Sequence, residues 1–179
     1  MLLAEAALPA LEALTRLNAL PEQEARSALT RCCGATRWVE QMLRARPFAS
    51  ARALHEAAED IWAALGAEDV REAFAHHPEI GANVEALRQK FGATQDLSRA
   101  EQASVGEASE ATLHALARFN VSYRERFGYS FIVCATGKSA QEMLDILYSR
   151  IDHAPEVELA IAAAEQAKIT RLRLEKIAS

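Results

Sequence analysis

Residues 74–81, with the sequence FAHHPEIG, close a run of predicted helices with a pair of histidines, a proline and a glycine. A proline pushes the residue before it out of the α region, so His77 should lie where a helix has just ended. Loops held by rigid neighbours often carry binding and catalytic side chains, which makes His77 a candidate functional residue. The alternative interpretation is that a histidine before Pro78 simply ends a helix.

The composition around this stretch favours a single helical domain. The chain has 179 residues, of which 50% are hydrophobic, and it is long enough to bury a core without disulfides or metals. Alanine and leucine outnumber valine and isoleucine, and these side chains lose little freedom on entering a helix. We therefore expect an all-α fold, with one compact multi-helix domain over residues 1–179.

Charge and hydropathy exclude several classes of partner. The net charge of −5 provides no basic field for a nucleic-acid partner. No apolar run is as long as a membrane span, and the first twenty residues lack the pattern of a signal peptide. The final residues 177–179, IAS, are not a peroxisomal SKL signal. We expect a cytoplasmic protein that uses neither nucleic acid nor membrane as a partner.

Apolar periodicity and helix-end signals set the predicted order of elements. Helices are predicted over residues 8–20, 22–33, 36–46, 51–65, 70–75, 84–90, 98–128, 140–151 and 155–174. Ser50 is a predicted N-cap, Gly34 a C′ residue, and the pairs Asp69–Glu72 and Ser139–Glu142 have capping-box spacing.

Residues 129–135 are the exception to the helical pattern. Their aromatic and β-branched side chains favour an extended backbone, and the sequence offers no second strand to pair with it. We predict an extended segment that passes through the core. Its backbone polar groups then need partners, and a bound ligand is one possibility.

Polar side chains on other predicted elements have competing interpretations. Ser98 and Glu101 have capping-box spacing, which explains Glu101 structurally, yet a helix N-terminus also attracts anionic ligands. His55 and Glu59 lie one helical turn apart, but two groups make an incomplete metal site. The three cysteines form no disulfide framework and are predicted to be small buried side chains.

Three blocks occur in order along the chain: HPEIG at 77–81, SRAEQ at 98–102, and FG at 127–128 with FIVCA at 131–135. Together with KI at 168–169 and LRL at 172–174, they resemble the 2-oxo-4-hydroxy-4-carboxy-5-ureidoimidazoline (OHCU) decarboxylase family. The resemblance implies an all-helical homodimer that needs no cofactor or metal. Its small-molecule substrate would be OHCU, which is converted in urate degradation to (S)-allantoin and carbon dioxide.

The same resemblance implies roles for individual residues. The catalytic histidine corresponds to His77 and not to His76, the active-site glutamate to Glu101, and a C-terminal arginine to Arg173, with Arg171 close by. The implied substrate contacts are Pro78, Ser98, Arg99, Ala100, Glu101, Gln102, Phe131, Ile132, Val133, Cys134 and Ala135. The chain departs from the usual pattern at Glu79 and at residues 129–130, where the family often has Phe-Pro.

Other functions fit parts of the sequence. A non-catalytic helical module would bind a protein partner through one apolar face and would have no small-molecule pocket near His77. A metal enzyme would combine His55, Glu59 and His77. A third possibility is a piece of a larger purine-pathway protein, although the chain shows no second domain.

Overall fold

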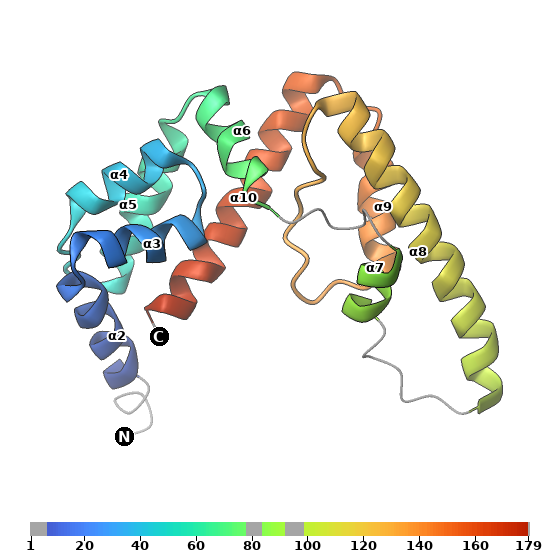
Figure 1. The fold of residues 1–179 in the computed structure, drawn as a ribbon, viewed down its shortest axis with the longest axis horizontal. Coiled ribbons are helices and arrows are strands. Elements are labelled where there is room, and N and C mark those ends of the chain that lie inside the picture. The colour runs from blue at the N-terminus through green and yellow to red at the C-terminus, as the bar shows by residue number, and fades with distance from the viewer. Residues whose placement is uncertain (1–6, 78–83, 92–98, 179) are drawn as a thin grey trace. The chain divides into compact units, whose positions relative to one another are not determined.

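The computed structural model describes the backbone of residues 7–77, 84–91 and 99–178, and the side chains in these ranges except those of residues 7–11, 86, 89–91 and 99–109. Every regular element in the described ranges is a helix, which confirms the all-α prediction (Figure 1). The helices are α2 (Ala7–Ala19), α3 (Glu22–Cys32), α4 (Thr36–Ala45), α5 (Ala51–Ala63), α6 (Ala67–Ala75), α7 (Val84–Phe91), α8 (Arg99–Phe127), α9 (Ala140–Arg150) and α10 (Pro155–Ile177).

The chain forms two compact units. The first contains Met1–His76 together with Ala163–Ser179, and the second contains His77–Ala162. Helix α10 therefore contributes its first residues to the second unit and its later residues to the first. A single domain over residues 1–179 stays a prediction. In the described part of the chain, no helix is both long and apolar enough to cross a bilayer.

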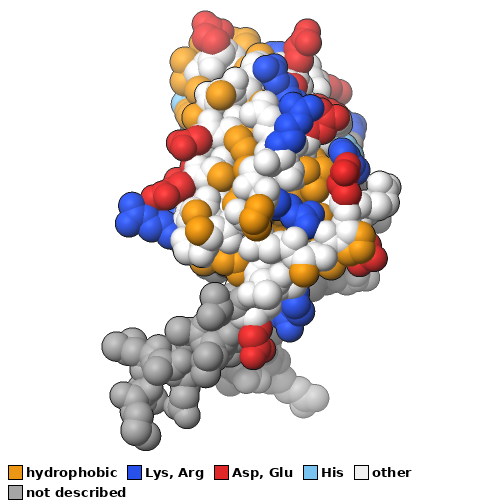
Figure 2. All heavy atoms as spheres, turned by 90° about the vertical axis from the view of Figure 1, so that its left-hand side faces the viewer, with side chains coloured by type: hydrophobic (Ala, Val, Ile, Leu, Met, Phe, Trp, Pro, Cys, Tyr) orange, Lys and Arg blue, Asp and Glu red, His pale blue; other side chains and the backbone are white. Residues whose placement is uncertain are grey.

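The first unit is built around α4. Helix α4 packs against α3, α5 and α6, and α2 packs against α5. Trp38 and Met42 of α4 are completely buried. The Trp38 indole Nε1 donates a hydrogen bond to the Ala58 carbonyl at 3.1 Å, so burying this ring leaves its N–H satisfied. Acidic and basic side chains are interspersed with apolar ones over the face of this unit seen in Figure 2.

Helix α6 begins differently from the prediction. Its N-cap is Gly66, whose N–H donates to the Asp69 carboxylate at 3.2 Å, so Asp69 occupies the third helical position. The predicted Asp69–Glu72 capping box is therefore wrong. Glu72 instead accepts hydrogen bonds from the N–H and hydroxyl of Thr36 at 3.0 and 2.6 Å. The N–H groups in the first turn of a helix have no partner within the helix, and a nearby carboxylate can accept their hydrogen bonds. Glu72 does so for Thr36, the first residue of α4.

Gly34 follows the C-cap of α3, as predicted, but for a different physical reason. Its φ is not positive, so no left-handed turn requires glycine here. The His76 side chain lies directly over it: a Cβ atom on Gly34 would be 2.3 Å from His76 Cγ. Glycine at position 34 is what allows the end of α6 to approach the end of α3.

In the second unit, α8 packs against α9 and α7. Helix α8 ends at Phe127, and the next residue, Gly128, has a φ of +78°, the left-handed conformation typical of the residue after a helix. The predicted capping box of α9 is confirmed. The Ser139 N–H donates to the Glu142 carboxylate at 2.7 Å, and the Glu142 N–H donates to the Ser139 hydroxyl at 3.2 Å.

Candidate active site

His77 lies at a bend directly after α6 and is half-buried. The preceding residue, His76, is the C-cap of α6, with φ −84° and ψ 0°. The prediction that a helix has just ended at His77 is therefore confirmed. Pro78, the first of the implied substrate contacts, lies outside the described residues, as does the rest of the block to residue 81.

The second block lies at the beginning of α8. The backbone of Arg99–Gln102 forms the first turn of this 29-residue helix. Ser98 and the side chains of Arg99, Ala100, Glu101 and Gln102 lie outside the described residues. The placement of Glu101 at a helix N-terminus is confirmed at the level of the backbone, while its capping and catalytic interpretations stay predictions.

The third block forms the predicted extended segment. Residues 129–135 follow α8 without regular secondary structure. Phe131, Ile132 and Val133 are 3%, 2% and 3% exposed, whereas Cys134 and Ala135 are half-buried. Three consecutive buried side chains belong to the core of the unit, so a ligand at this segment would meet chiefly its backbone groups and residues 134–135.

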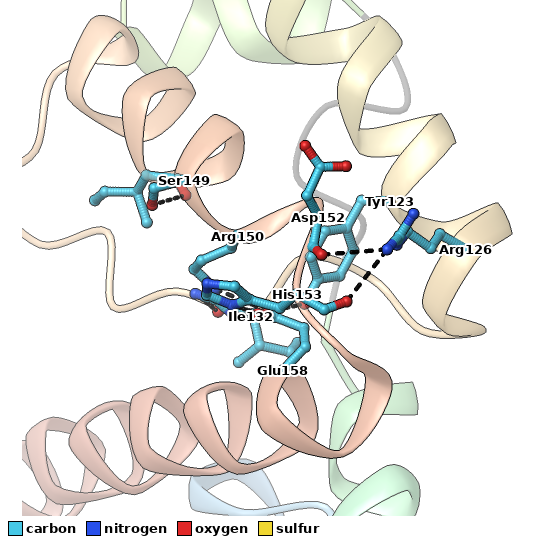
Figure 3. A network of polar contacts seen from close by, with 9 residues as sticks. Tyr123, Arg126, Ile132, Ser149, Arg150, Asp152, His153 and Glu158 are labelled. Atoms are coloured by element: carbon cyan, nitrogen blue, oxygen red, sulfur yellow. Dashed lines mark hydrogen bonds and ion pairs between the residues drawn. The ribbon is translucent and has the colours of Figure 1, made fainter.

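Arg150, the last residue of α9, binds this segment from inside the unit (Figure 3). Its Nη1 donates to the Ile132 carbonyl at 2.9 Å. The central carbon of the Arg150 guanidinium, Cζ, lies 4.8 Å from the centre of the Phe131 ring, within range of a cation–π interaction. Arg150 thus contacts two consecutive residues of the segment, one through its backbone and one through its ring.

Glu158, in the first turn of α10, is the counter-charge of Arg150. Its Oε1 accepts hydrogen bonds from Arg150 Nε at 2.8 Å, from Arg150 Nη2 and from the Tyr123 hydroxyl. Its Oε2 lies 3.0 Å from Nδ1 of His153. Both oxygens therefore have partners, as a completely buried polar group requires.

Tyr123, on α8, also binds Glu158. Burial, together with the hydrogen bond to the Glu158 carboxylate, raises the pKa of the Tyr123 phenol far above its usual range, so the hydroxyl remains a donor. The Tyr123 ring also packs edge-on against the Phe131 ring, with centroids 5.2 Å apart. We call Tyr123, Arg150, His153 and Glu158 the buried polar cluster.

Sequence patterns did not predict the buried polar cluster, because its members come from three different helices and the turn before α10. One signal was present. Met143, Leu147 and Arg150 lie at helical spacing on one face of α9, and the first two are completely buried. An arginine that continues an apolar stripe is expected either to reach solvent or to meet a buried partner, and here the partner is Glu158.

The two C-terminal arginines belong to the first unit and differ in their contacts. Arg173 is half-buried and donates to the carbonyl oxygens of Arg31 and Cys32 at 3.2 and 3.3 Å, at the C-terminal end of α3. A cation satisfies unpaired carbonyls at that end of a helix. Arg171 is exposed and pairs with Glu59 at 2.8 Å. The catalytic assignment of Arg173 stays a prediction.

The ion pair between Glu59 and Arg171 involves one of the three residues, His55, Glu59 and His77, of the alternative metal-enzyme prediction. Glu59 is already engaged by a cation, which competes with any metal ion for its carboxylate. Burial, and then the nearby Arg171, lower the pKa of His55. No group of three or more His, Cys, Asp or Glu side chains with metal-site geometry occurs among the described residues.

Comparison with known proteins identifies the family of this chain. The family model for OHCU decarboxylase matches residues 18–175, which include all three sequence blocks. The chain belongs to the OHCU decarboxylase family. The family prediction from the sequence is thereby confirmed.

Relatives in the OHCU decarboxylase family include separate enzymes and parts of longer proteins. The uric acid degradation bifunctional protein TTL of Arabidopsis thaliana is 38% identical over 149 residues, which are 83% of this chain and 45% of that protein. The chain thus spans less than half of the Arabidopsis protein. The OHCU decarboxylase of Haloferax volcanii is 29% identical over 140 residues, covering 76% of this chain and 79% of the relative.

Two solved structures resemble the chain in fold. A crystal structure of OHCU decarboxylase in the presence of (S)-allantoin is 37% identical, with a TM-score of 0.66 over 82% of this chain and 94% of that one. A crystal structure of (S)-allantoin synthase has a TM-score of 0.67 over 92% of this chain and 53% of that one. At 20% identity, the second structure supports the all-helical fold alone.

Proposed function

We propose that this chain decarboxylates OHCU to (S)-allantoin and carbon dioxide in urate degradation. The observation that carries the proposal is the family match over residues 18–175, because it contains the histidine, glutamate and extended-segment blocks in order. The solved relative at 37% identity, an OHCU decarboxylase in the presence of (S)-allantoin, supports the same substrate class.

The chemistry of the substrate needs a proton donor. Breaking the C–C bond to the carboxylate releases carbon dioxide and leaves its electron pair on a ring carbon. The adjacent C=N bond accepts this pair, so the substrate supplies its own electron sink. The enol-like intermediate is then protonated on carbon. Formation of a single enantiomer requires that this proton arrive on one face.

His77 is the proposed proton donor. A free histidine side chain has a pKa of about 6.5, so this residue type exchanges protons close to neutral pH. Its half-buried position at the end of α6 suits a group that must meet a substrate. Glu101 would hold the substrate hydroxyl, and backbone N–H groups of residues 132–135 would bind the polar edge of the ring. Arg173 would support the carboxylate or the glutamate.

The first experiment replaces His77 with glutamine. OHCU is generated in place from urate by the two preceding enzymes of the pathway, and allantoin formation is followed by optical rotation or circular dichroism. Wild-type protein should convert slow racemic decay into rapid formation of one enantiomer. In His77→Gln this acceleration should fall by about 10²- to 10⁴-fold, the usual contribution of a positioned general acid.

His76→Gln is the matched control, because it makes the same substitution at the adjacent histidine. Its activity should stay near that of the wild type, since His76 is exposed and packs over Gly34. Full activity of folded His77→Gln would exclude the proposed proton donor. Failure of wild-type protein to accelerate the reaction would instead favour the non-catalytic helical module.

The homodimer and the cytoplasmic location stay predictions. Light scattering of the purified protein tests the first, since a dimer would have twice the 19.6 kDa mass of the chain.

A further inference from the structure

The Arg150–Glu158 pair is buried to a degree that charged side chains seldom reach. Glu158 is 0% and Arg150 4% exposed. A buried ion pair is often no more stabilising than apolar residues of similar volume, because both charges lose their hydration. A net gain in stability is therefore a poor explanation for this pair. Its contacts with the extended segment offer a better one.

The described part of the chain provides no helix or sheet ladder that sets the backbone direction of residues 129–135. Buried backbone groups of such a segment must find other partners. For the Ile132 carbonyl the partner is Arg150 Nη1, at 2.9 Å. The direction of this carbonyl is thus set by a charged side chain from α9.

Fixing one carbonyl also fixes the next N–H group. The Ile132 C=O and the Val133 N–H belong to one planar peptide unit, and in the trans form they point in opposite directions. When Arg150 holds the carbonyl on its own side, the Val133 N–H is directed to the other side. Rotation of this peptide would break a charge-assisted hydrogen bond inside the core.

Glu158 and Tyr123 keep the Arg150 guanidinium in the orientation in which it binds the Ile132 carbonyl. Glu158 Oε1 accepts from Nε and Nη2 of Arg150, which leaves Nη1 directed at the Ile132 carbonyl. The guanidinium is planar and rigid, so holding two of its nitrogens determines the direction of the third. The Tyr123 hydroxyl donates to the same Glu158 oxygen and holds the carboxylate in turn.

We propose that Arg150, oriented by Glu158 and Tyr123, is a positioning residue that directs the Val133 N–H toward a carbonyl oxygen of a cyclic ureide ligand. The proposal rests on the proposed function, in which residues 131–135 contact the substrate. Arg150 itself lies in the core of the unit and acts through the peptide that it holds.

The test compares Arg150→Lys with Arg126→Lys. Lysine keeps the charge at position 150 but cannot hold Glu158 and the Ile132 carbonyl with one planar group. Arg126 provides the control, because it also donates to carbonyl oxygens, those of Asp152 and His153 at 3.3 Å each, but is exposed. Binding of (S)-allantoin is measured by titration, following the Val133 amide by NMR, and KM and kcat are measured with OHCU generated in place.

Arg150→Lys should weaken (S)-allantoin binding and raise KM by about tenfold, the effect of one misaligned charge-assisted hydrogen bond. Its kcat should change by less than about threefold, and the product should remain a single enantiomer, because the proposed proton donor is untouched. Arg126→Lys should match the wild type. A merely structural role would lower the melting temperature of Arg150→Lys without changing KM at temperatures where the variant is folded.

Unchanged KM and unchanged allantoin affinity in folded Arg150→Lys would overturn the proposal. If that variant does not fold, Tyr123→Phe replaces it, since this change removes one donor to Glu158 and preserves the aromatic packing. Tyr123→Phe should raise KM about two- to fivefold, and an unchanged KM would again overturn the proposal. If wild-type protein neither binds (S)-allantoin nor accelerates its formation, the proposed function itself fails.

Discussion

A methyl group added at Gly34 would clash with His76, the C-cap of α6 and the residue before His77. In Gly34→Ala the new Cβ would lie 2.3 Å from His76 Cγ and 2.4 Å from His76 Cβ. Real Cβ atoms do not approach other carbons this closely, so a neighbouring group must move. Rotation about χ1 moves the imidazole ring but leaves His76 Cβ in place, which means that the end of α6 has to shift.

Two contacts resist that shift. Glu72 of α6 is bound to Thr36 at the start of α4, and Asp69 lies 3.6 Å from Arg37. Overpacking of a well-packed site costs about 1–3 kcal/mol. For a protein of this length, each kcal/mol lowers the melting temperature by roughly 2–4 °C, so we expect a decrease of about 2–12 °C.

A double-mutant cycle measures this clash directly. Urea and thermal unfolding are compared for Gly34→Ala, His76→Gly, His76→Ala and the two double variants. His76→Gly should restore most of the stability lost in Gly34→Ala, because it removes the Cβ atom that cannot rotate away. His76→Ala should restore little, since its Cβ remains 2.4 Å from the added methyl group.

A free energy of unfolding for Gly34→Ala within about 0.5 kcal/mol of the wild type, the range of neutral surface substitutions, would contradict the predicted clash. Equal recovery of stability by His76→Ala and His76→Gly would contradict the assignment of the clash to His76 Cβ. In that case the conflict would involve the imidazole ring rather than the backbone position of α6.

Two further predictions concern other sites. The N–H and hydroxyl of Ser139 hold the pKa of Glu142 below its ordinary 4.5, so this contribution to stability is present above that pH and is lost as pH falls through the folded-state pKa. The melting temperature of Ser139→Ala should therefore be a few degrees below that of the wild type at pH 7, and this difference should become smaller as the pH falls below 4.5. Burial raises the pKa of the Cys32 and Cys33 thiols to about 11, so Ellman's reagent at pH 8 should leave both unmodified in folded protein and modify both in denaturant. If Cys32 or Cys33 in the native protein reacted with Ellman's reagent as fast as Cys134 does, the result would contradict the burial of these two thiols.

Local signals in the sequence predicted the elements well. Ser50 caps α5 by accepting from the Ala53 N–H at 3.1 Å, and the capping box of α9 has the predicted partners. These interactions join residues three positions apart, so composition and spacing contain the information needed. The extended segment at residues 129–135 was predictable for a similar reason, because its side chains disfavour a helix locally.

Contacts between distant residues were not predictable in the same way. Asp69 and Glu72 have capping-box spacing, yet Glu72 binds Thr36, 36 positions earlier in the chain. A carboxylate takes whichever free N–H group the fold brings nearest, and sequence spacing does not contain that distance. Gly34 shows the same limit, since only the position of His76 in space explains why a side chain is excluded there.

The sequence by itself therefore determined the helical class, most helix ends, the extended segment and the family. Through the family resemblance it also predicts His77 as the catalytic histidine. The tertiary structure alone decided that Arg150, Glu158 and Tyr123 meet in the core and that Arg150 holds the Ile132 carbonyl. The physical reason is the distance along the chain between the residues that interact. Caps and helical periodicity depend on neighbours within one or two turns, whereas a buried ion pair forms only where packing brings separate elements together and removes water from both charges.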